Sequence, residues 1–157
     1  MADERLREER GASATLPTAD DTFKLGARLG ADLRAGDVVV LSGPLGAGKT
    51  VLAKGIAEAM DVTGEVISPT FVLARVHRAR RAGAPAMVHV DMYRLRDGAT
   101  DLTAELDSLD LDTDLDEAVV VVEWGEGLAE RLSERHLDVR LCFKDDETRT
   151  ATWEWHR

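Results

Sequence analysis

The sequence is poor in cysteine and in long apolar runs. Its 157 residues include one cysteine, Cys142, so an intramolecular disulfide cannot form. No apolar run approaches the roughly 20 residues that a membrane-spanning helix needs. Residues 1–10 are charged throughout and lack the apolar centre of a signal peptide. We therefore expect a cytoplasmic protein that does not associate with membranes.

Positive charge is also scarce. The chain has 20 Lys and Arg against 30 Asp and Glu, which gives a net charge of −10 at pH 7. Proteins that bind nucleic acid unaided carry a basic surface that displaces counterions from the phosphates. The composition therefore argues against stable binding of free nucleic acid. The length suits one domain, and the hydrophobic content of 44% is sufficient for a core.

The residue pattern predicts a short tail followed by one domain. Residues 1–14 mix charged with small residues and lack an apolar stripe, so we expect a mobile tail there and a single domain over 15–157. Leucines spaced by four residues from Leu25 predict a helix. We expect it to begin at the Asp20–Thr22 cluster and to end at Gly36.

Several apolar segments predict strands. Continuous runs at 38–41, 86–90 and 119–122 are typical of buried strands, and alternation predicts a further strand over 72–76. Alternating residues on both sides of a polar turn at 144–147 predict an antiparallel hairpin at the sheet edge. The expected fold class is α/β, with a mostly parallel central sheet flanked by helices.

One stretch carries a motif with a known chemistry. Gly43-Pro-Leu-Gly-Ala-Gly-Lys-Thr50 matches the Walker A pattern and lies between an apolar strand and a helical segment. In such a loop the backbone N–H groups point at phosphate oxygens, and the dipole of the following helix adds to their effect. We expect Lys49 to reach the β and γ phosphates and the Thr50 hydroxyl to contact Mg²⁺.

Two carboxylates follow predicted strands. Glu123 comes after four valines, as in a Walker B motif with Glu in place of Asp, and Asp91 comes after the 86–90 run. A carboxylate at this place can hold Mg²⁺ or its waters. Taken singly, each of them is more simply a helix cap or a turn residue. The Walker A motif upstream favours a metal role for at least one.

Four motifs in this order resemble the TsaE (YjeE) family. They are Gly43–Thr50, Ser68-Pro-Thr-Phe71, His89-Val-Asp-Met-Tyr-Arg-Leu95 and Val121-Val-Glu-Trp124, and the resemblance covers about residues 16–155. TsaE proteins are small bacterial ATPases required for the threonylcarbamoyladenosine (t6A) modification of tRNA. The resemblance implies a P-loop domain that hydrolyses ATP slowly and works with TsaB and TsaD. It also implies that this protein reaches tRNA through that complex.

The resemblance implies roles for individual residues. Lys49 binds phosphate, Thr50 and Glu123 contact Mg²⁺, and Asp91 is a second acid near the metal that hydrolysis needs. Thr70 supplies a hydroxyl on a switch-like loop over Ser68–Phe71, although it can equally be a turn residue after Pro69. The implied nucleotide-binding residues are Gly43, Leu45, Gly46, Ala47, Gly48, Lys49, Thr50, Val51 and Trp124.

Two positions depart from the family pattern. Pro44 stands where the family usually has Asp and offers no N–H, and Val51 stands where it has a second Thr and offers only its N–H. The family also contacts the adenine side through the segment around Thr18–Thr22 and the hairpin near Arg149. His89, within an apolar run, is expected to be a hydrogen-bonded core histidine rather than a general base.

The leading hypothesis is an ATPase in which water attacks the γ-phosphate in line. Lys49, Mg²⁺ and the loop amides would stabilise the charge that develops. A P-loop small-molecule kinase is an alternative, but the sequence has no insertion that resembles a lid. A nucleotide-regulated binding module with little turnover would use the same residues. A GTPase is disfavoured because the Asn-Lys-x-Asp motif that reads guanine is absent.

Overall fold

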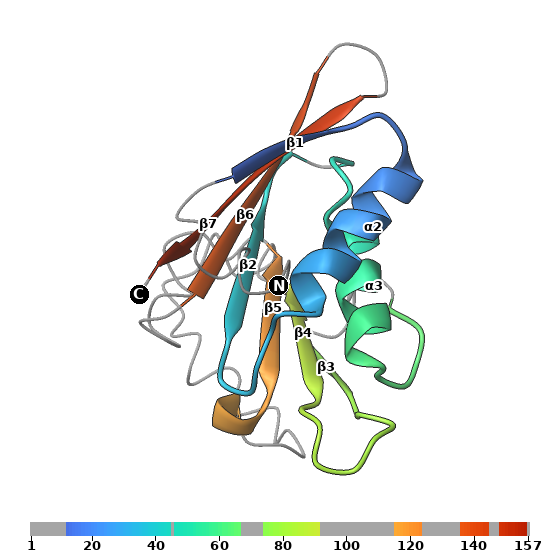
Figure 1. Cartoon of the computed structure of the whole chain (residues 1–157), viewed down its shortest axis with the longest axis vertical. Coiled ribbons are helices and arrows are strands. Elements are labelled where there is room, and N and C mark those ends of the chain that lie inside the picture. Colours follow the sequence, from blue (N-terminus) through green and yellow to red (C-terminus); the bar gives the residue numbers. More distant parts are fainter. Residues whose placement is uncertain are drawn as a thin grey trace.

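A mixed sheet with two helices on one face forms the body of the protein (Figure 1). The computed structural model describes residues 12–44, 46–66, 74–91, 115–123, 136–144 and 148–156. The helices are α2 (Ala19–Gly30) and α3 (Lys49–Met60), and a 3₁₀ turn, η2, spans Leu115–Glu117. This arrangement confirms the predicted α/β class. In the part of the chain described, neither helix has the length and apolarity to cross a membrane.

The seven strands form one sheet in the order β1-β7-β6-β2-β5-β4-β3. Their bounds are β1 Ala12–Leu16, β2 Val38–Ser42, β3 Ala74–His77, β4 Met87–Asp91, β5 Val119–Glu123, β6 His136–Phe143 and β7 Arg149–His156. The neighbours β6, β2, β5 and β4 run parallel, whereas β1–β7, β7–β6 and β4–β3 are antiparallel. The sheet is therefore mixed, not mostly parallel as we predicted.

The C-terminal hairpin forms, but it does not lie at the edge of the sheet. Strand β1 covers the outer side of β7, with Ala12 opposite Trp153 and Leu16 opposite Arg149. Residues 12–14, which we expected in the tail, therefore belong to a strand. The main-chain groups of β7 can pair with any extended segment, so β1 needs no apolar stripe, and buried Leu16 anchors its end. Residues 1–11 lie outside the described part.

The central strands follow the apolar runs of the sequence. Every residue of β2 and β5 is buried, as expected for strands with both faces covered. The strand predicted over 72–76 is observed as β3, which begins at Ala74, while 72 and 73 lie outside the described residues.

Helix α2 begins and ends earlier than its sequence indicated. Thr18, not the Asp20–Thr22 cluster, is the N-cap: the Thr18 N–H donates to the Asp21 carboxylate at 2.9 Å, and the Asp21 N–H donates to the Thr18 hydroxyl at 3.2 Å. The helix ends at Gly30 rather than at Gly36. A turn in which the Arg34 N–H donates to the Asp37 carboxylate at 2.7 Å then leads the chain into β2.

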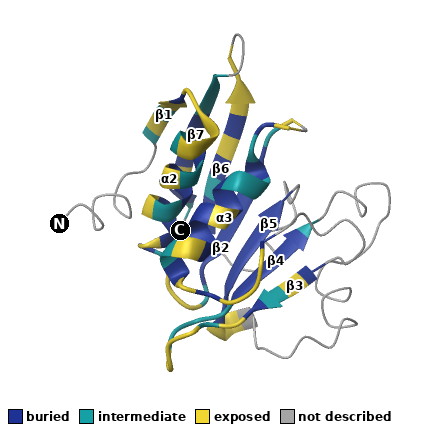
Figure 2. Ribbon diagram, turned by 90° about the vertical axis from the view of Figure 1, so that its right-hand side faces the viewer, coloured by how far each residue is buried: buried dark blue, intermediate teal, exposed yellow. Residues whose placement is uncertain are grey.

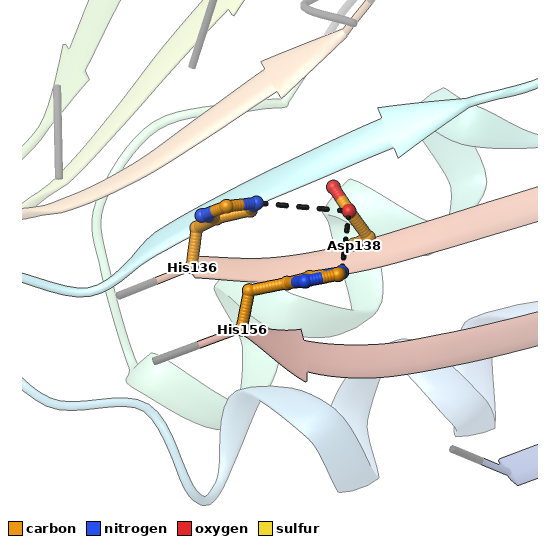
Figure 3. A group of neighbouring side chains, drawn as sticks. All are labelled: His136, Asp138 and His156. Atoms are coloured by element: carbon orange, nitrogen blue, oxygen red, sulfur yellow. Dashed lines mark ion pairs between the residues drawn. The ribbon is translucent and has the colours of Figure 1, made fainter. Parts of the chain in front are cut away.

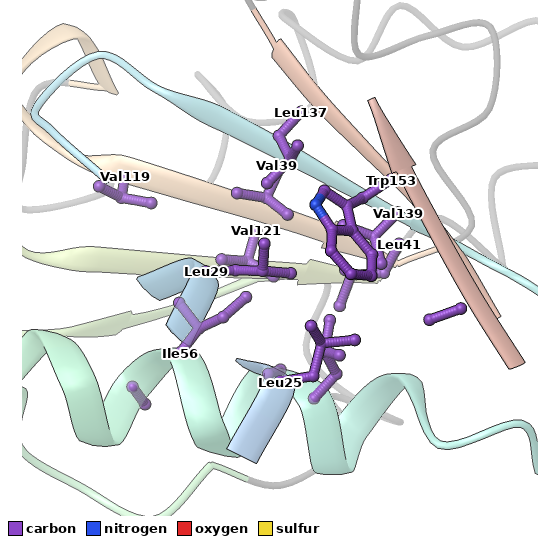
Figure 4. Packing of buried hydrophobic residues seen from close by; sticks show 14 of the residues in the cluster. Leu25, Leu29, Val39, Leu41, Ile56, Val119, Val121, Leu137, Val139 and Trp153 are labelled. Atoms are coloured by element: carbon purple, nitrogen blue, oxygen red, sulfur yellow. The ribbon is translucent and has the colours of Figure 1, made fainter. Parts of the chain in front are cut away.

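The core lies between the helix pair and the sheet. Figure 4 shows Leu25, Leu29 and Ile56 of the helices meeting side chains from four strands. The sheet contributes Val39, Leu41, Val119, Val121, Leu137, Val139 and Trp153. Figure 2 shows β2 and β5 as buried along their length, whereas buried residues on β6 alternate with more exposed ones. Because side chains alternate along a strand, Glu123 lies on the same face as Val119 and Val121, below the start of α3.

Candidate functional site

The loop over Gly43–Thr50 joins the end of β2 to the start of α3. Gly48 is the N-cap of α3 and has a φ of 102°, a left-handed conformation that glycine adopts without a steric penalty. Helix α3 then starts at Lys49, with its N-terminal N–H groups at the loop. A strand, a tight loop and a helix N-terminus in this order provide a site suited to anions.

Lys49 is held inside the loop. Its side chain is buried, and its Nζ donates hydrogen bonds to the carbonyl oxygens of Gly43 at 2.7 Å and Pro44 at 2.9 Å. Pro44, which has no N–H to offer, therefore contributes its carbonyl, which also accepts from the Ala47 N–H at 3.1 Å. The loop thus positions an ammonium group where phosphate oxygens would be stronger, charged acceptors than these carbonyls.

Thr50 and Glu123 meet across 73 residues of sequence. The Thr50 hydroxyl donates to Oε1 of Glu123 at 3.3 Å, and Oε2 of Glu123 lies 2.5 Å from Nε2 of His89. His89 is fully buried and Glu123 is 3% exposed, so water does not replace these partners. The prediction that His89 is a hydrogen-bonded core histidine is confirmed, and its partner is the carboxylate expected at the metal.

Asp91 ends the strand beside Glu123. The parallel register of β4 and β5 places the two residues directly opposite each other, and Asp91 is half-buried. The carboxyl ends of parallel strands meet at one edge of a sheet, next to the loop that follows β2. The hydroxyl of Thr50 and the carboxylate of Glu123 are hard oxygen donors of the kind that Mg²⁺ prefers, and Asp91 adds a third on the next strand.

Two distant segments border the same loop. Buried Thr22 of α2 has its methyl group 3.4 Å from the place where a Cβ on Gly48 would lie. The Arg149 guanidinium donates to the Gly46 carbonyl at 3.4 Å and lies 4.0 Å from the centre of the Phe143 ring. The segments that the resemblance placed on the adenine side therefore lie against the loop. Phe143, an exposed aromatic residue at the end of an alternating strand, belongs to none of the motifs in the sequence.

Some predicted site residues cannot be placed. Leu45, Thr70 with the rest of Ser68–Phe71, and Trp124 lie outside the described residues. Val51 is half-buried in the first turn of α3. The structure thus brings together Lys49, Thr50 and Glu123, and it sets Asp91 on the adjoining strand.

Comparisons with known proteins agree with this architecture. The family model described as threonylcarbamoyl adenosine biosynthesis protein TsaE matches residues 16–151. The crystal structure of Bacillus subtilis YdiB superposes with a TM-score of 0.69 and covers 93% of this chain and 85% of its own. Its sequence identity is 24%, so this likeness concerns the fold.

Two mycobacterial relatives are much closer in sequence. A Mycobacterium tuberculosis protein is 72% identical over 149 residues, which cover 94% of this chain and 89% of that protein. A Mycobacterium leprae protein is 67% identical over 148 residues, which cover 93% and 92%. Both carry the name tRNA threonylcarbamoyladenosine biosynthesis protein TsaE. The family model and these identities over most of the chain show that it belongs to the TsaE family of tRNA threonylcarbamoyladenosine biosynthesis.

Proposed function

We propose that this protein is a cytoplasmic, Mg²⁺-dependent ATPase that serves the t6A modification of tRNA together with TsaB and TsaD proteins. The observation that carries the ATP site is the bond between Thr50 and Glu123 at 3.3 Å. It joins the end of the Walker A loop to the end of a neighbouring strand, where a P-loop enzyme needs an oxygen donor for its metal.

The residues at the carboxyl ends of these parallel strands would have different roles in binding ATP. Lys49 would exchange its two carbonyl partners for phosphate oxygens, and the loop N–H groups would bind the same phosphates. Thr50 and Glu123 would hold Mg²⁺, with Asp91 close to its waters. The ion would supply charge neutralisation on the β and γ phosphates.

His89 positions Glu123. Its contact fixes one carboxylate oxygen, so the other is directed toward Thr50. A buried histidine that holds a metal-binding carboxylate restricts its rotation before the ligand arrives. The γ-phosphate would thus meet a preorganised set of charges, which is how phosphoryl transfer is accelerated.

The proposed partnership rests on the family and on the charge of the chain. A net charge of −10 is unfavourable for holding tRNA directly, so a role in tRNA modification calls for partners that bind the tRNA. Cycles of ATP binding and hydrolysis would then change the affinity of this protein for those partners.

A pair of lysine variants tests the ATP site. Lys49→Ala removes the ammonium group at the loop, whereas Lys54→Ala removes an exposed lysine from the same helix. We expect Lys49→Ala to lose Mg²⁺-dependent ATP binding in calorimetric titrations and to lose phosphate release, while Lys54→Ala matches the wild type. Equal binding and hydrolysis in Lys49→Ala would refute the proposal.

Reconstitution tests the biological role. The protein is mixed with TsaB, TsaD, the threonylcarbamoyl donor and tRNA, and t6A is measured by mass spectrometry over many turnovers. We expect repeated modification to need ATP, Lys49 and Glu123. Modification that continues at the full rate without this protein would rule out the role, even if the ATP site behaves as expected.

A further inference from the structure

A second cluster of chemically active side chains lies on the opposite side of the sheet. Leu137 and Val139 of β6 point into the core beneath the helices, so His136 and Asp138 point to the other face. On β7, Trp153 and Trp155 are in the core, and His156 therefore lies on the same outer face as Asp138. The proposed nucleotide site does not use this face.

The cluster also lies at the amino ends of the parallel strands, whereas the Gly43–Thr50 loop lies at their carboxyl ends. The nucleotide loop follows Ser42, whose partner in β6 is Arg140, whereas His136 pairs with Val38 at the start of β2. The cross-strand register places His136 directly opposite His156, and Asp138 is two residues along β6. The pairing of β6 with β7 thus brings His156 next to His136 and Asp138, which the alternation alone did not reveal.

The three side chains converge on a small volume (Figure 3). The nearest Asp138 oxygen is 2.9 Å from Nε2 of His156 and 3.6 Å from Nε2 of His136. One donor atom from each residue lies within 4.8 Å of the others. Ligand atoms around a tetrahedral Zn²⁺ with bonds of about 2.05 Å lie roughly 3.3 Å apart. The distances from the Asp138 oxygen to the two histidine nitrogens, 2.9 and 3.6 Å, lie on either side of that value.

His136 has unused hydrogen-bonding capacity at this place. It is 5% exposed, and its Nδ1 has no hydrogen-bond partner among the residues described. Its Nε2 is 3.6 Å from Asp138, which is too long for a good hydrogen bond. A cation held between this Nε2 and the Asp138 carboxylate would give the nitrogen a stronger partner than Asp138 alone provides.

The surroundings supply both imidazoles and further oxygen donors. The two imidazole rings are stacked with centroids 4.9 Å apart, so neighbouring strands present them side by side at Asp138. A second carboxylate, Glu154, approaches His156 Nε2 to 3.9 Å. Asp138, Glu154 and His156 also line a shallow hollow of about 530 Å³, through which solvent reaches the cluster.

We propose that His136, Asp138 and His156 bind a divalent transition-metal ion, with Zn²⁺ as the preferred ion and Glu154 or water completing the coordination. Imidazole nitrogens suit Zn²⁺, whereas Mg²⁺ and Ca²⁺ favour all-oxygen sites, so this centre is distinct in chemistry from the magnesium site proposed at Thr50. The ion would join β6 to β7 and stabilise the hairpin whose far end carries Phe143 and Arg149.

Direct metal binding tests the proposal. Full-length protein stripped with a chelator is titrated with Zn²⁺ by calorimetry, without nucleotide, and its thermal unfolding is followed with and without the ion. We expect one bound Zn²⁺ per chain and a higher unfolding temperature when it is present. Absence of Zn²⁺ binding to the wild type would overturn the proposal.

Variants identify the ligands. His156→Gln and Asp138→Asn each change a half-buried side chain. In protein that unfolds cooperatively on heating, each should weaken Zn²⁺ binding at least tenfold, or about 1.4 kcal/mol. Cys142→Ser is the matched control, because Cys142 is an exposed thiol on the same face of β6. It should bind Zn²⁺ as the wild type does. Unchanged affinity in His156→Gln and Asp138→Asn, or lost affinity in Cys142→Ser, would refute the assignment.

Cobalt provides an independent readout. Co²⁺ bound in place of Zn²⁺ should give visible absorption bands from nitrogen and oxygen ligands, without the intense near-ultraviolet band of a thiolate ligand. These bands should disappear in His156→Gln. A thiolate band in the wild type would show that Cys142 binds the ion and would overturn the proposal.

Discussion

At the scale of single residues, the contact between His89 and Glu123 controls the orientation of a carboxylate. Both side chains are buried, and Nε2 of His89 lies 2.5 Å from Oε2 of Glu123. The histidine therefore has a role that its apolar surroundings in the sequence concealed. It would act on the proposed metal site through Glu123.

We expect His89→Leu to lower the Mg²⁺-dependent kcat for ATP about 10- to 100-fold, the range found when a partner of a metal ligand is removed. The apparent affinity for Mg²⁺ should fall with it, because Glu123 would lose its fixed orientation. His89→Gln keeps a neutral donor and should recover part of the loss. A Mg²⁺ dependence in His89→Leu equal to that of the wild type, in protein shown to be folded, would contradict this role.

His77 makes stability depend on pH. Burial lowers the pKa of His77, the hydrogen bond to the Thr63 carbonyl at 2.9 Å opposes that shift, and the neighbouring His89 and Arg75 lower the pKa further. Below a pH of about 6.5 the unfolded chain therefore binds a proton more readily at this residue than the folded chain does. Stability should fall as the pH falls through that window.

The His77→Asn variant isolates this contribution. Asparagine can donate to Thr63 but does not titrate, so the free energy of unfolding should decrease less between pH 7.5 and 5.5 than in the wild type. Urea unfolding at each pH provides the measurement. A decrease as steep as that of the wild type would show that other groups are responsible.

The place of the candidate site was predictable where short stretches of sequence determine it. The Walker A pattern placed Lys49 and Thr50 between a strand and a helix, and the strand ends placed Glu123 and Asp91 at the same edge of the sheet. The carbonyl contacts of Pro44 were not predictable, because they depend on the loop conformation. The cluster around Asp138 was missed because it depends on a register between strands that a sequence pattern does not specify.

At the scale of elements, the two helices approach each other until their backbones touch. A Cβ added to Gly55 of α3 would lie 2.1 Å from the Phe23 carbonyl oxygen of α2. Gly55 is a poor helix former in the middle of α3. In the structure it permits the contact that holds the pair together over the sheet.

We therefore expect Gly55→Ala to lower the free energy of unfolding by about 1–3 kcal/mol or more, although alanine is the better helix former. Lys54→Ala, on the exposed side of the same helix, should stay within about 0.5 kcal/mol of the wild type. Chemical denaturation of both variants provides the comparison. A Gly55→Ala protein as stable as the wild type would mean that the helices can separate at no cost.

The elements were easier to predict than their boundaries. The buried strands were visible as apolar runs, because both of their faces are covered. The ends of α2 were not visible in the sequence. Several residues near Thr18 can cap a helix, and the turn closed by Asp37 takes the place of the last residues expected to be helical. Strand β1 escaped prediction because its pairing depends on main-chain groups rather than on side chains.

At the scale of the whole molecule, the Gly43–Thr50 loop, which we propose binds ATP, is contacted by segments that are distant in sequence. Helix α2 reaches it through Thr22 and the C-terminal hairpin through Arg149. Nucleotide binding should therefore be sensitive to changes made far from the motif in sequence.

Arg149→Ala tests this dependence. We expect Kd for ATP to rise roughly 2- to 12-fold, the equivalent of one modest hydrogen bond of about 0.5–1.5 kcal/mol. Arg140→Ala, a change of an exposed arginine elsewhere in the hairpin, should leave Kd unchanged. Titration with a fluorescent ATP analogue distinguishes the two. Equal affinities in the two variants would show that the hairpin does not influence the loop.

The pairing of β1 with β7 has a consequence for synthesis of the chain. Ala12 leaves the ribosome well before its neighbour in the sheet, Trp153, because it comes far earlier in the sequence. A contact of this sequence separation is slow to form, and its strand must wait while the intervening chain is made. Strand β1 is thus translated before β6 and β7, yet it can join the sheet only after β7 has been made.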